Sequence, residues 1–347
     1  MEEAAQITEI ETFIPFALQK PTPASELPLQ RIILLGDHYQ NSPVIQNLAL
    51  RQHSNLEQSL FARLVRLGVP TVHLDQQGRA RPSIASLYSW RYHNLGDLPL
   101  LETQPEYAIA NPGFRHDFQF INVEDFDKTG ETCPQAHFYQ NLGEAEYAAA
   151  IYQYMRLIGY PREKITILTT YVGQKALIKD VLQRRCAKNP LFGLPGGGVS
   201  TVDKYQGEQN DCMLLQVSLP YFFSLLMIFV DVILSLVRTT RPGYLRDMRR
   251  MTVALSRARL GLYVLGRRNV FESCYELSEA FGRLIAGRGT KLELAVGEMW
   301  PGQRKAGVVE ARGGEGTVVM EDVRHMGQFV YEMTVTAVET MKQGGRK

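Results

Sequence analysis

Apolar positions along the chain recur in short runs that alternate with helical periods. The short runs predict buried strands, and they lie at 31–37, 71–75, 118–123, 164–170, 199–202, from 211 onward and at 262–265. The helical patterns lie at 7–18, 55–68, 82–92, 144–158, 174–186, from 247 onward and at 270–285. This alternation predicts an α/β fold with a parallel sheet that is covered by helices on both faces.

The composition changes at two places, and these changes predict the domain limits. Residues 94–116 are rich in Pro, Asn and Gly, so we expect a first lobe over 1–110 and a second lobe over 111–285. From residue 286 onward Gly and charged residues dominate, which predicts a loosely ordered tail over 286–347. Within this tail, residues 326–341 have a helical pattern.

One segment has the composition of a membrane span. Residues 217–237 are almost wholly apolar, with Asp231 as the only charged residue, and the segment is long enough to cross a bilayer. The alternative is an apolar insertion over 217–234 that comes from a translated intron or a faulty gene model. A membrane span here would split the second lobe, and Asp231 would cost a few kcal/mol in hydrocarbon. We therefore favour the insertion and expect no membrane association.

The length, charge and cysteines of the chain limit its domain number, its nucleic-acid surface and its cellular compartment. A chain of 347 residues is long enough for about two domains. Because the net charge is only +2, any nucleic-acid surface must be local. The four cysteines are far apart and lack metal-ligand spacing, as is typical of reduced thiols in an intracellular protein.

The helix that begins near residue 247 carries arginines off its apolar face. Asp247 is a plausible N-cap, and Met248, Met251, Leu255 and Ala258 recur at helical spacing. Arg257 therefore points away from the buried face, and a guanidinium on a rigid helix can stabilise charge on a transferred phosphoryl group. The same pattern also fits Arg257 and Arg259 as solvated surface charges.

Two motifs near the start of the chain combine carboxylates with a turn. Glu2 and Glu3 could hold Mg²⁺ and polarise a water molecule, or they could be acids at a helix N-terminus. The stretch 36–43 (G-D-H-Y-Q-N-S-P) follows a predicted strand, where α/β sheets bind ligands. Gln40 could sense a γ-phosphate there, or the stretch could be a simple polar turn.

Two further stretches could contact phosphates. In 77–82 (Q-G-R-A-R-P), Arg79 could bind a phosphate, and Arg81 could bind nucleic acid, a carboxylate or only water. The stretch 167–174 (I-L-T-T-Y-V-G-Q) ends a predicted strand with hydroxyls and an aromatic ring. Hydroxyls can bind a nucleic-acid backbone, and Tyr171 could stack on a base.

Taken together, these stretches and V-S-T-V-D-K-Y-Q-G at 199–207 resemble motifs II to VI of superfamily 1 helicases of the Upf1-like group, over roughly residues 1–285. The resemblance implies RecA-like lobes that bind ATP and Mg²⁺ between them. It implies the following roles: Glu2 at Mg²⁺, Glu3 at the attacking water, Gln40 at the γ-phosphate, Arg79 and Arg257 as arginine fingers, Gly36, Asp37, Gln206 and Gly207 around the nucleotide, and Thr170, Tyr171 and Thr201 along RNA.

Stretches outside these motifs narrow the resemblance. Among them, W-R-Y-H-N-L-G-D-L-P at 90–99 and F-I-N-V-E-D-F at 120–126 resemble an intron-binding, spliceosomal branch of the group. This implies pre-mRNA intron RNA and spliceosomal proteins as partners, and a nuclear location.

The sequence contains no G-x-x-x-x-G-K-[ST] stretch, the loop that holds the β- and γ-phosphates. The family places that loop upstream of motif II. We therefore expect the chain to begin inside the first lobe and not to hydrolyse ATP alone. The competing hypothesis is a catalytically silent module that binds RNA or splicing partners.

Overall fold

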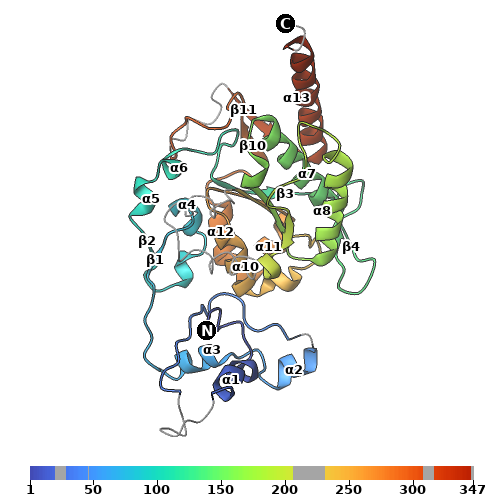
Figure 1. The fold of residues 1–347 in the computed structure, drawn as a ribbon. Coiled ribbons are helices and arrows are strands. Elements are labelled where there is room, and N and C mark those ends of the chain that lie inside the picture. Colours follow the sequence, from blue (N-terminus) through green and yellow to red (C-terminus); the bar gives the residue numbers. More distant parts are fainter. Residues whose placement is uncertain (20–28, 46, 206–230, 308–315, 345–347) are drawn as a thin grey trace. The chain divides into compact units, whose positions relative to one another are not determined.

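The computed structural model describes residues 1–19, 29–45, 47–205, 231–307 and 316–344. It divides the chain into two compact units, Met1–Asp75 and Gln76–Lys347, which we describe separately (Figure 1). We call them unit 1 and unit 2.

Unit 2 is built on a five-stranded sheet whose strand order is β3-β9-β8-β6-β7. The strands are β3 (Phe118–Asn122), β6 (Ile165–Thr169), β7 (Val199–Thr201), β8 (Asp231–Ser235) and β9 (Gly261–Gly266). Every pairing in this sheet is parallel. The predicted α/β class with a parallel sheet is confirmed.

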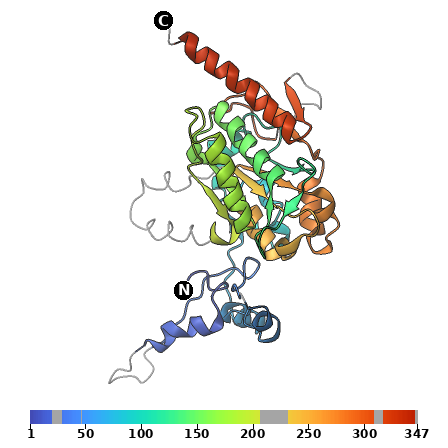
Figure 2. The ribbon, with the colours of Figure 1, turned by 90° about the vertical axis from the view of Figure 1, so that its right-hand side faces the viewer.

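Helices cover both faces of this sheet (Figures 1 and 2). On one face Ile233 shares a buried cluster with residues of α7 (Leu142–Leu157) and α8 (Val172–Arg185). On the other face Val232 and Leu234 pack with residues of α10 (Met248–Ser256), α11 (Arg268–Glu272) and α12 (Ser278–Ile285). Because successive side chains of a strand point to opposite faces, the V-I-L run of β8 supplies both clusters.

Strand β8 corrects the predicted limits of the apolar insertion. Residues 231–234, assigned above to the insertion, form most of the central strand, in register with Ile165–Thr169 and Gly261–Leu265. An apolar run buried on both faces suits this central position. The strand predicted from 211 and residues 217–230 lie outside the described residues. Among the helices that the structure describes, none is both long and apolar enough to cross a membrane.

The predicted loosely ordered tail is wrong for much of its length. Strand β10 (Leu292–Ala295) pairs antiparallel with β11 (Thr317–Met320), and α13 (Val323–Gly344) packs on α7. Leu292, Leu294 and Met326 are fully buried, so alternating and helically spaced apolar residues outweigh the local Gly and charge content. The helix predicted at 326–341 lies within α13 and is confirmed.

The boundary between the units also differs from the prediction. Residues 76–110 belong to unit 2, because Ala80, Ile84 and Leu87 are buried in the same cluster as β9. This segment contains β1 (Gln76–Gln77), α4 (Pro82–Ala85), η1 (Ser89–Arg91), β2 (Gly96–Asp97), α5 (Leu100–Thr103) and α6 (Pro105–Ala108). The remaining short elements of unit 2 are β4 (Glu131–Thr132), β5 (Gln140–Asn141), η2 (Arg162–Lys164), η3 (Gly243–Arg246) and η4 (Tyr275–Leu277).

Unit 1 contains α1 (Glu9–Ala17), α2 (Leu48–His53) and α3 (Leu60–Arg66). Thr8 and Glu11 form a capping box at α1, and Glu9 of this helix pairs with Arg63 of α3 at 2.6 Å. The predicted strands at 31–37 and 71–75 are not formed. Both segments lack neighbouring strands within the described part of unit 1, and Ile33 and Val72 are 70% and 95% exposed.

Candidate nucleotide and nucleic-acid site

In unit 1 the backbone brings the two carboxylate-bearing motifs side by side. The Leu35 amide donates to the Met1 carbonyl at 2.9 Å, and the Ala4 amide donates to the Leu35 carbonyl at 2.8 Å. A Cβ on Gly36 would lie 2.8 Å from the Ala5 nitrogen, so glycine permits this close approach. The backbone of residues 1–5, which includes Glu2 and Glu3, therefore lies beside Leu35 and Gly36.

Asp37 holds the candidate phosphate sensor. Its carboxylate accepts hydrogen bonds from the Gln40 side-chain amide and the Tyr39 backbone amide, both at 2.8 Å. Glu3, whose backbone has a positive φ of 47°, accepts a hydrogen bond of 2.5 Å from the Gln6 side chain. Within unit 1, Asp37 is thus a positioning residue for Gln40.

In unit 2 the charges of Arg79 and Arg257 both act on Tyr88. Burial raises the pKa of Tyr88 to about 12, and the positive charges of Arg79 and Arg257 oppose this shift. Arg79 is partly exposed, and its guanidinium makes no hydrogen bond or ion pair within the described residues. The Arg257 side chain donates to the Val253 carbonyl at 3.1 Å and the Ser256 hydroxyl at 3.0 Å.

Tyr107 joins the two arginine-bearing loops, and sequence reasoning missed it. Its hydroxyl donates to the Arg79 carbonyl and accepts from Arg259 Nε, each at 2.8 Å. The Arg81 amide also donates to the Arg259 carbonyl at 2.8 Å. Tyr107 lies in the Pro- and Gly-rich stretch that predicts a lobe boundary, so the sequence offers no signal for this role.

The neighbouring arginines are structural. Arg81 is 3% exposed, forms an ion pair with Asp117 and donates to the Ile109 carbonyl at 2.6 Å. Arg259 is 7% exposed and forms an ion pair with Glu106. Arg257 is 6% exposed, so the interpretation of Arg257 and Arg259 as solvated surface charges is wrong, and Arg257 is not directed into solvent as its helical position predicts. The carboxylate alternative for Arg81 is confirmed.

Thr170 and Thr201 lie at the carboxyl ends of β6 and β7, and both are partly exposed. The Thr170 hydroxyl donates to the Leu236 carbonyl at 3.4 Å. The arginine loops, in contrast, adjoin the start of β9, because Arg259 shortly precedes Gly261. Since all strands are parallel, the arginines and the threonines lie at opposite edges of the sheet.

The predicted stacking role of Tyr171 needs correction. Its ring is 6% exposed and packs edge-on against Tyr139 and Tyr244, with centroids 5.1 and 6.2 Å apart. The Tyr171 hydroxyl accepts a hydrogen bond from the Tyr244 amide at 3.0 Å. A Cβ on Gly243 would lie 2.4 Å from this hydroxyl. Tyr171 therefore fixes the loop around Gly243 and presents no free face to a base.

Two carboxylates hold the loop that follows β8, and the sequence predicts no role for either of them. Glu131 accepts from Arg238 Nε at 2.8 Å and from the Thr239 amide at 2.7 Å. Glu144 accepts from the Val237 amide at 2.8 Å, where Val237 has a positive φ of 72°. Burial raises the pKa of Glu144 to about 7, and its hydrogen bonds oppose this rise. A single Glu in a loop or a helix gives no sequence signal for such a role.

Within the described residues, the side chains that could bind a magnesium nucleotide do not form one preassembled metal site. They contain no cluster of three or more His, Cys, Asp or Glu side chains that could hold a metal. Mg²⁺ bound to a nucleotide needs only one or two carboxylates, because phosphates and water complete its shell. The exposed Glu2 carboxylate meets this requirement. Gln206 and Gly207 lie outside the described residues.

Comparison with known proteins identifies relatives over nearly the whole chain. A family model described as "AAA domain" matches residues 56–220 and 229–269, together more than half of the chain. RNA helicase aquarius of Mus musculus is 51% identical over 98% of this chain and 21% of the relative. Pre-mRNA-splicing factor cwf11 of Schizosaccharomyces pombe is 34% identical over 89% of this chain and 22% of the relative. The chain thus spans about a fifth of the length of these relatives.

Proposed function

This chain belongs to the AAA-domain family and to its Upf1-like group of superfamily 1 helicases, and from this premise we propose that it is an ATP-dependent RNA helicase module that acts in pre-mRNA splicing. The names of two relatives support a role on RNA and in splicing, because one is an RNA helicase and the other is a pre-mRNA-splicing factor. The proposed partners are intron RNA and spliceosomal proteins, and the proposed location is the nucleus.

The observation that carries the proposal is that the Tyr107 hydroxyl joins the Arg79 carbonyl to Arg259, which lies in the same loop as Arg257. Guanidinium groups suit an anionic phosphoryl group, and Arg79 makes no ion pair within the described residues that would compete for it. ATP would supply the phosphoryl group and Mg²⁺ would neutralise part of its charge. In this proposal both arginines stabilise the charge that develops on the γ-phosphoryl oxygens.

The proposed residues for binding Mg²⁺ and orienting the attacking water lie in unit 1. Glu2 would hold Mg²⁺, and Glu3 would orient the attacking water. Gln40, whose amide is fixed by Asp37, would contact the γ-phosphate. These roles follow from the family resemblance and from the backbone pairing that joins residues 1–4 to Leu35.

RNA would bind at the opposite edge of the unit 2 sheet. Thr170 and Thr201 end adjacent strands there, with Thr169 and Thr201 in register, and their hydroxyls can bind phosphate oxygens. The loop after β8 begins at the same edge, and Glu131 and Glu144 hold its backbone.

A chimaera tests the proposed function. This chain, without residues 221–228, replaces the matching stretch of mouse RNA helicase aquarius, and RNA-stimulated ATP hydrolysis is measured. Arg79→Ala and Arg257→Ala should each lower the rate by about 10³-fold, in the range found for removal of an arginine finger. Arg268→Ala is the matched control, because the Arg268 side chain is 43% exposed and its ion pair within the described residues is with Glu272 of the same helix. Unchanged hydrolysis in both variants would contradict the proposal.

A second candidate function is favoured by the absence of G-x-x-x-x-G-K-[ST] from the sequence. In this alternative the chain binds RNA or splicing proteins without hydrolysing ATP. The two candidates agree for the purified chain, from which we expect RNA binding but no RNA-stimulated turnover. They differ in the chimaera, where only the first predicts an arginine-dependent rate.

A further inference from the structure

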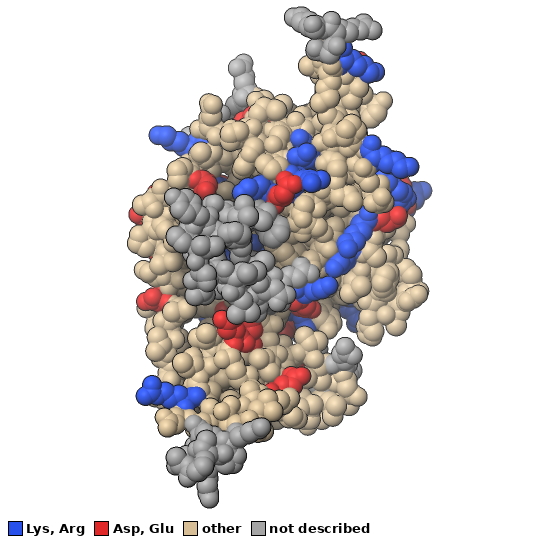
Figure 3. Space-filling model, viewed as in Figure 1, with Lys and Arg blue, Asp and Glu red and all other residues tan. Residues whose placement is uncertain are grey.

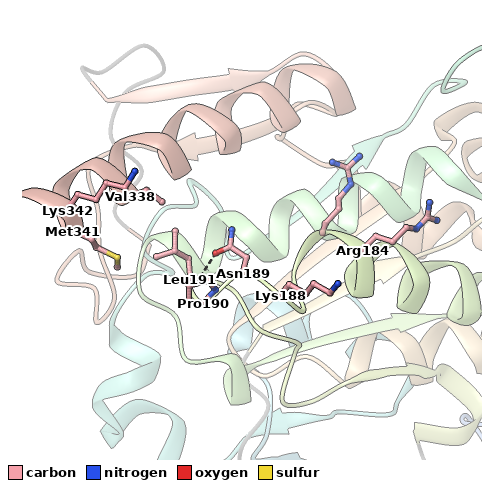
Figure 4. A pocket seen from close by; sticks show the side chains of 9 residues that line it. Arg184, Lys188, Asn189, Pro190, Leu191, Val338, Met341 and Lys342 are labelled. Carbon is pink, nitrogen blue, oxygen red and sulfur yellow. Dashed lines mark hydrogen bonds between the residues drawn. The ribbon is translucent and has the colours of Figure 1, made fainter. Parts of the chain in front are cut away.

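A groove between α8 and α13 has an apolar floor and a basic rim. It has a volume of about 640 Å³, and the arginines and threonines described above are not among its lining residues. Figure 4 shows Val338, Met341 and Lys342 of α13 on one side, with Pro190 and Leu191 of the loop after α8 facing them. The Leu191 amide donates to the Asn189 side chain at 3.0 Å, which fixes this loop. The groove therefore has defined walls.

The apolar floor continues a buried stripe of α13. Met326 and Val330 are buried against α7, and Met333 packs at the margin of the same cluster. The next residue of this stripe that lines the groove, Met341, is 63% exposed. Both ribbon views show α13 continuing past α7 and α8 (Figures 1 and 2). The helix thus carries its apolar face beyond the elements that cover it in the described part of unit 2.

The rim is cationic. Arg184, Arg185, Lys188 and Lys342 line the groove, and Figure 3 shows blue side chains gathered over the α8 side of unit 2. Arg184 and Arg185 pair with Asp180 and Glu146. Lys188 and Lys342 are exposed and form no ion pair within the described residues. Two lysines are therefore available to an anionic partner.

We propose that this groove binds an acidic amphipathic segment of a partner protein, with apolar side chains against Leu191 and Met341 and carboxylates at Lys188 and Lys342. An amphipathic helix laid in an apolar groove is a common recognition mode, and complementary charge sets its orientation. RNA fits less well, because single-stranded RNA is commonly gripped by aromatic stacking and the lining residues include no Phe, Tyr or Trp. The proposal does not depend on the helicase function.

The test uses the whole chain and a labelled synthetic helix-forming peptide, with Leu at i, i+3, i+4 and i+7 spacing and Glu at the other positions. Fluorescence anisotropy should show saturable binding, and a peptide with Lys in place of Glu should not bind. The double variant Lys188→Glu, Lys342→Glu should weaken binding by at least about tenfold. Lys128→Glu, Lys305→Glu makes the same charge change at exposed sites outside the groove and should alter binding by less than about twofold.

Three results would overturn the proposal. The first is no binding of the acidic peptide, and the second is an equal loss in both double variants, which would indicate general attraction only. The third is binding of an oligouridine that depends on Lys188 and Lys342 while peptide binding does not, which would assign the groove to RNA. Met341→Ser isolates the apolar contribution to peptide binding, because it should weaken binding of the peptide and leave any binding of oligouridine unchanged.

Discussion

The Tyr107 hydroxyl donates a hydrogen bond of 2.8 Å to the carbonyl oxygen of Arg79. The Tyr107 hydroxyl oxygen accepts in turn from Arg259 Nε, so one phenol joins the loops that carry both candidate arginine fingers. Because Tyr107 is buried, its removal leaves these two groups without a partner rather than exposing them to water.

Tyr107→Phe should therefore destabilise unit 2 by about 1–3 kcal/mol, the usual cost of leaving a buried polar group unpaired. Urea unfolding followed by circular dichroism measures this. Tyr331→Phe is the matched control, because Tyr331 is 64% exposed on α13 and its change should be within about 0.5 kcal/mol. Equal stabilities of the two variants would show that the hydrogen bonds of the Tyr107 hydroxyl contribute nothing to the free energy of unfolding.

Arg79 and Arg81 are two residues apart, but their replacement by alanine should have unequal effects on the free energy of unfolding. Arg79→Ala should change the free energy of unfolding by less than about 0.5 kcal/mol, since its guanidinium is partly exposed and bonds to no described residue. Arg81→Ala should cost about 3 kcal/mol, because it leaves the Asp117 carboxylate without its buried partner. Thermal and urea unfolding of the pair check this, and a destabilised Arg79→Ala would argue for a structural role instead.

Asp231 should make the stability of unit 2 depend on pH. Burial raises the pKa of Asp231 from 3.8 to about 7, against the opposing effect of Arg81. The folded chain therefore binds this proton more tightly than the unfolded chain. The contribution of Asp231 to stability is fully present below about pH 4 and is lost as the pH rises through about 7, at about 1.4 kcal/mol per unit of pKa difference.

Urea unfolding between pH 5 and pH 8 measures this loss. Asp231→Asn removes the titrating group and should reduce the fall in stability across the window. The remaining fall would come largely from Glu144, whose pKa burial also raises to about 7. An identical pH dependence in wild type and Asp231→Asn would contradict the assignment.

The family match is interrupted between residues 220 and 229, within the apolar insertion. Strand β8 begins at Asp231, and its pairings with β6 and β9 involve only residues from 231 onward. Deleting residues 221–228 should therefore leave the free energy of unfolding of unit 2 unchanged or higher. A loss of folded protein after this deletion, measured by circular dichroism and gel filtration, would show that the segment belongs to the fold.

Strong periodicity made most of unit 2 predictable. Every strand of the five-stranded sheet except β8 lies where an apolar run predicts it, and α7, α8 and α10 follow their helical patterns. For β8 the prediction failed at the end of a long apolar stretch. No turn-forming residue directly precedes Asp231 in the sequence, and only the pairing register of β8 with β6 and β9 reveals the strand.

The site was predictable only where a residue belongs to a motif. Arg79 and Arg257 could be paired by resemblance, and the structure adds the hydrogen bonds that join the Arg79 carbonyl to Arg259. Tyr107, Glu131 and Glu144 act through hydrogen bonds to residues distant in sequence, which no local pattern encodes. Tyr171 shows the opposite error, because a tyrosine at a strand end can serve packing as well as base stacking.

The most direct test of the central claim is a double-mutant cycle on Arg79 and Arg257 in the chimaera, with single-turnover ATP hydrolysis as the measurement. If both guanidinium groups stabilise the same phosphoryl group, the double variant should be much less impaired than the product of the single effects, because residues that act as a unit are not additive. Independent, multiplicative effects, or a loss confined to one of the two variants, would contradict the account.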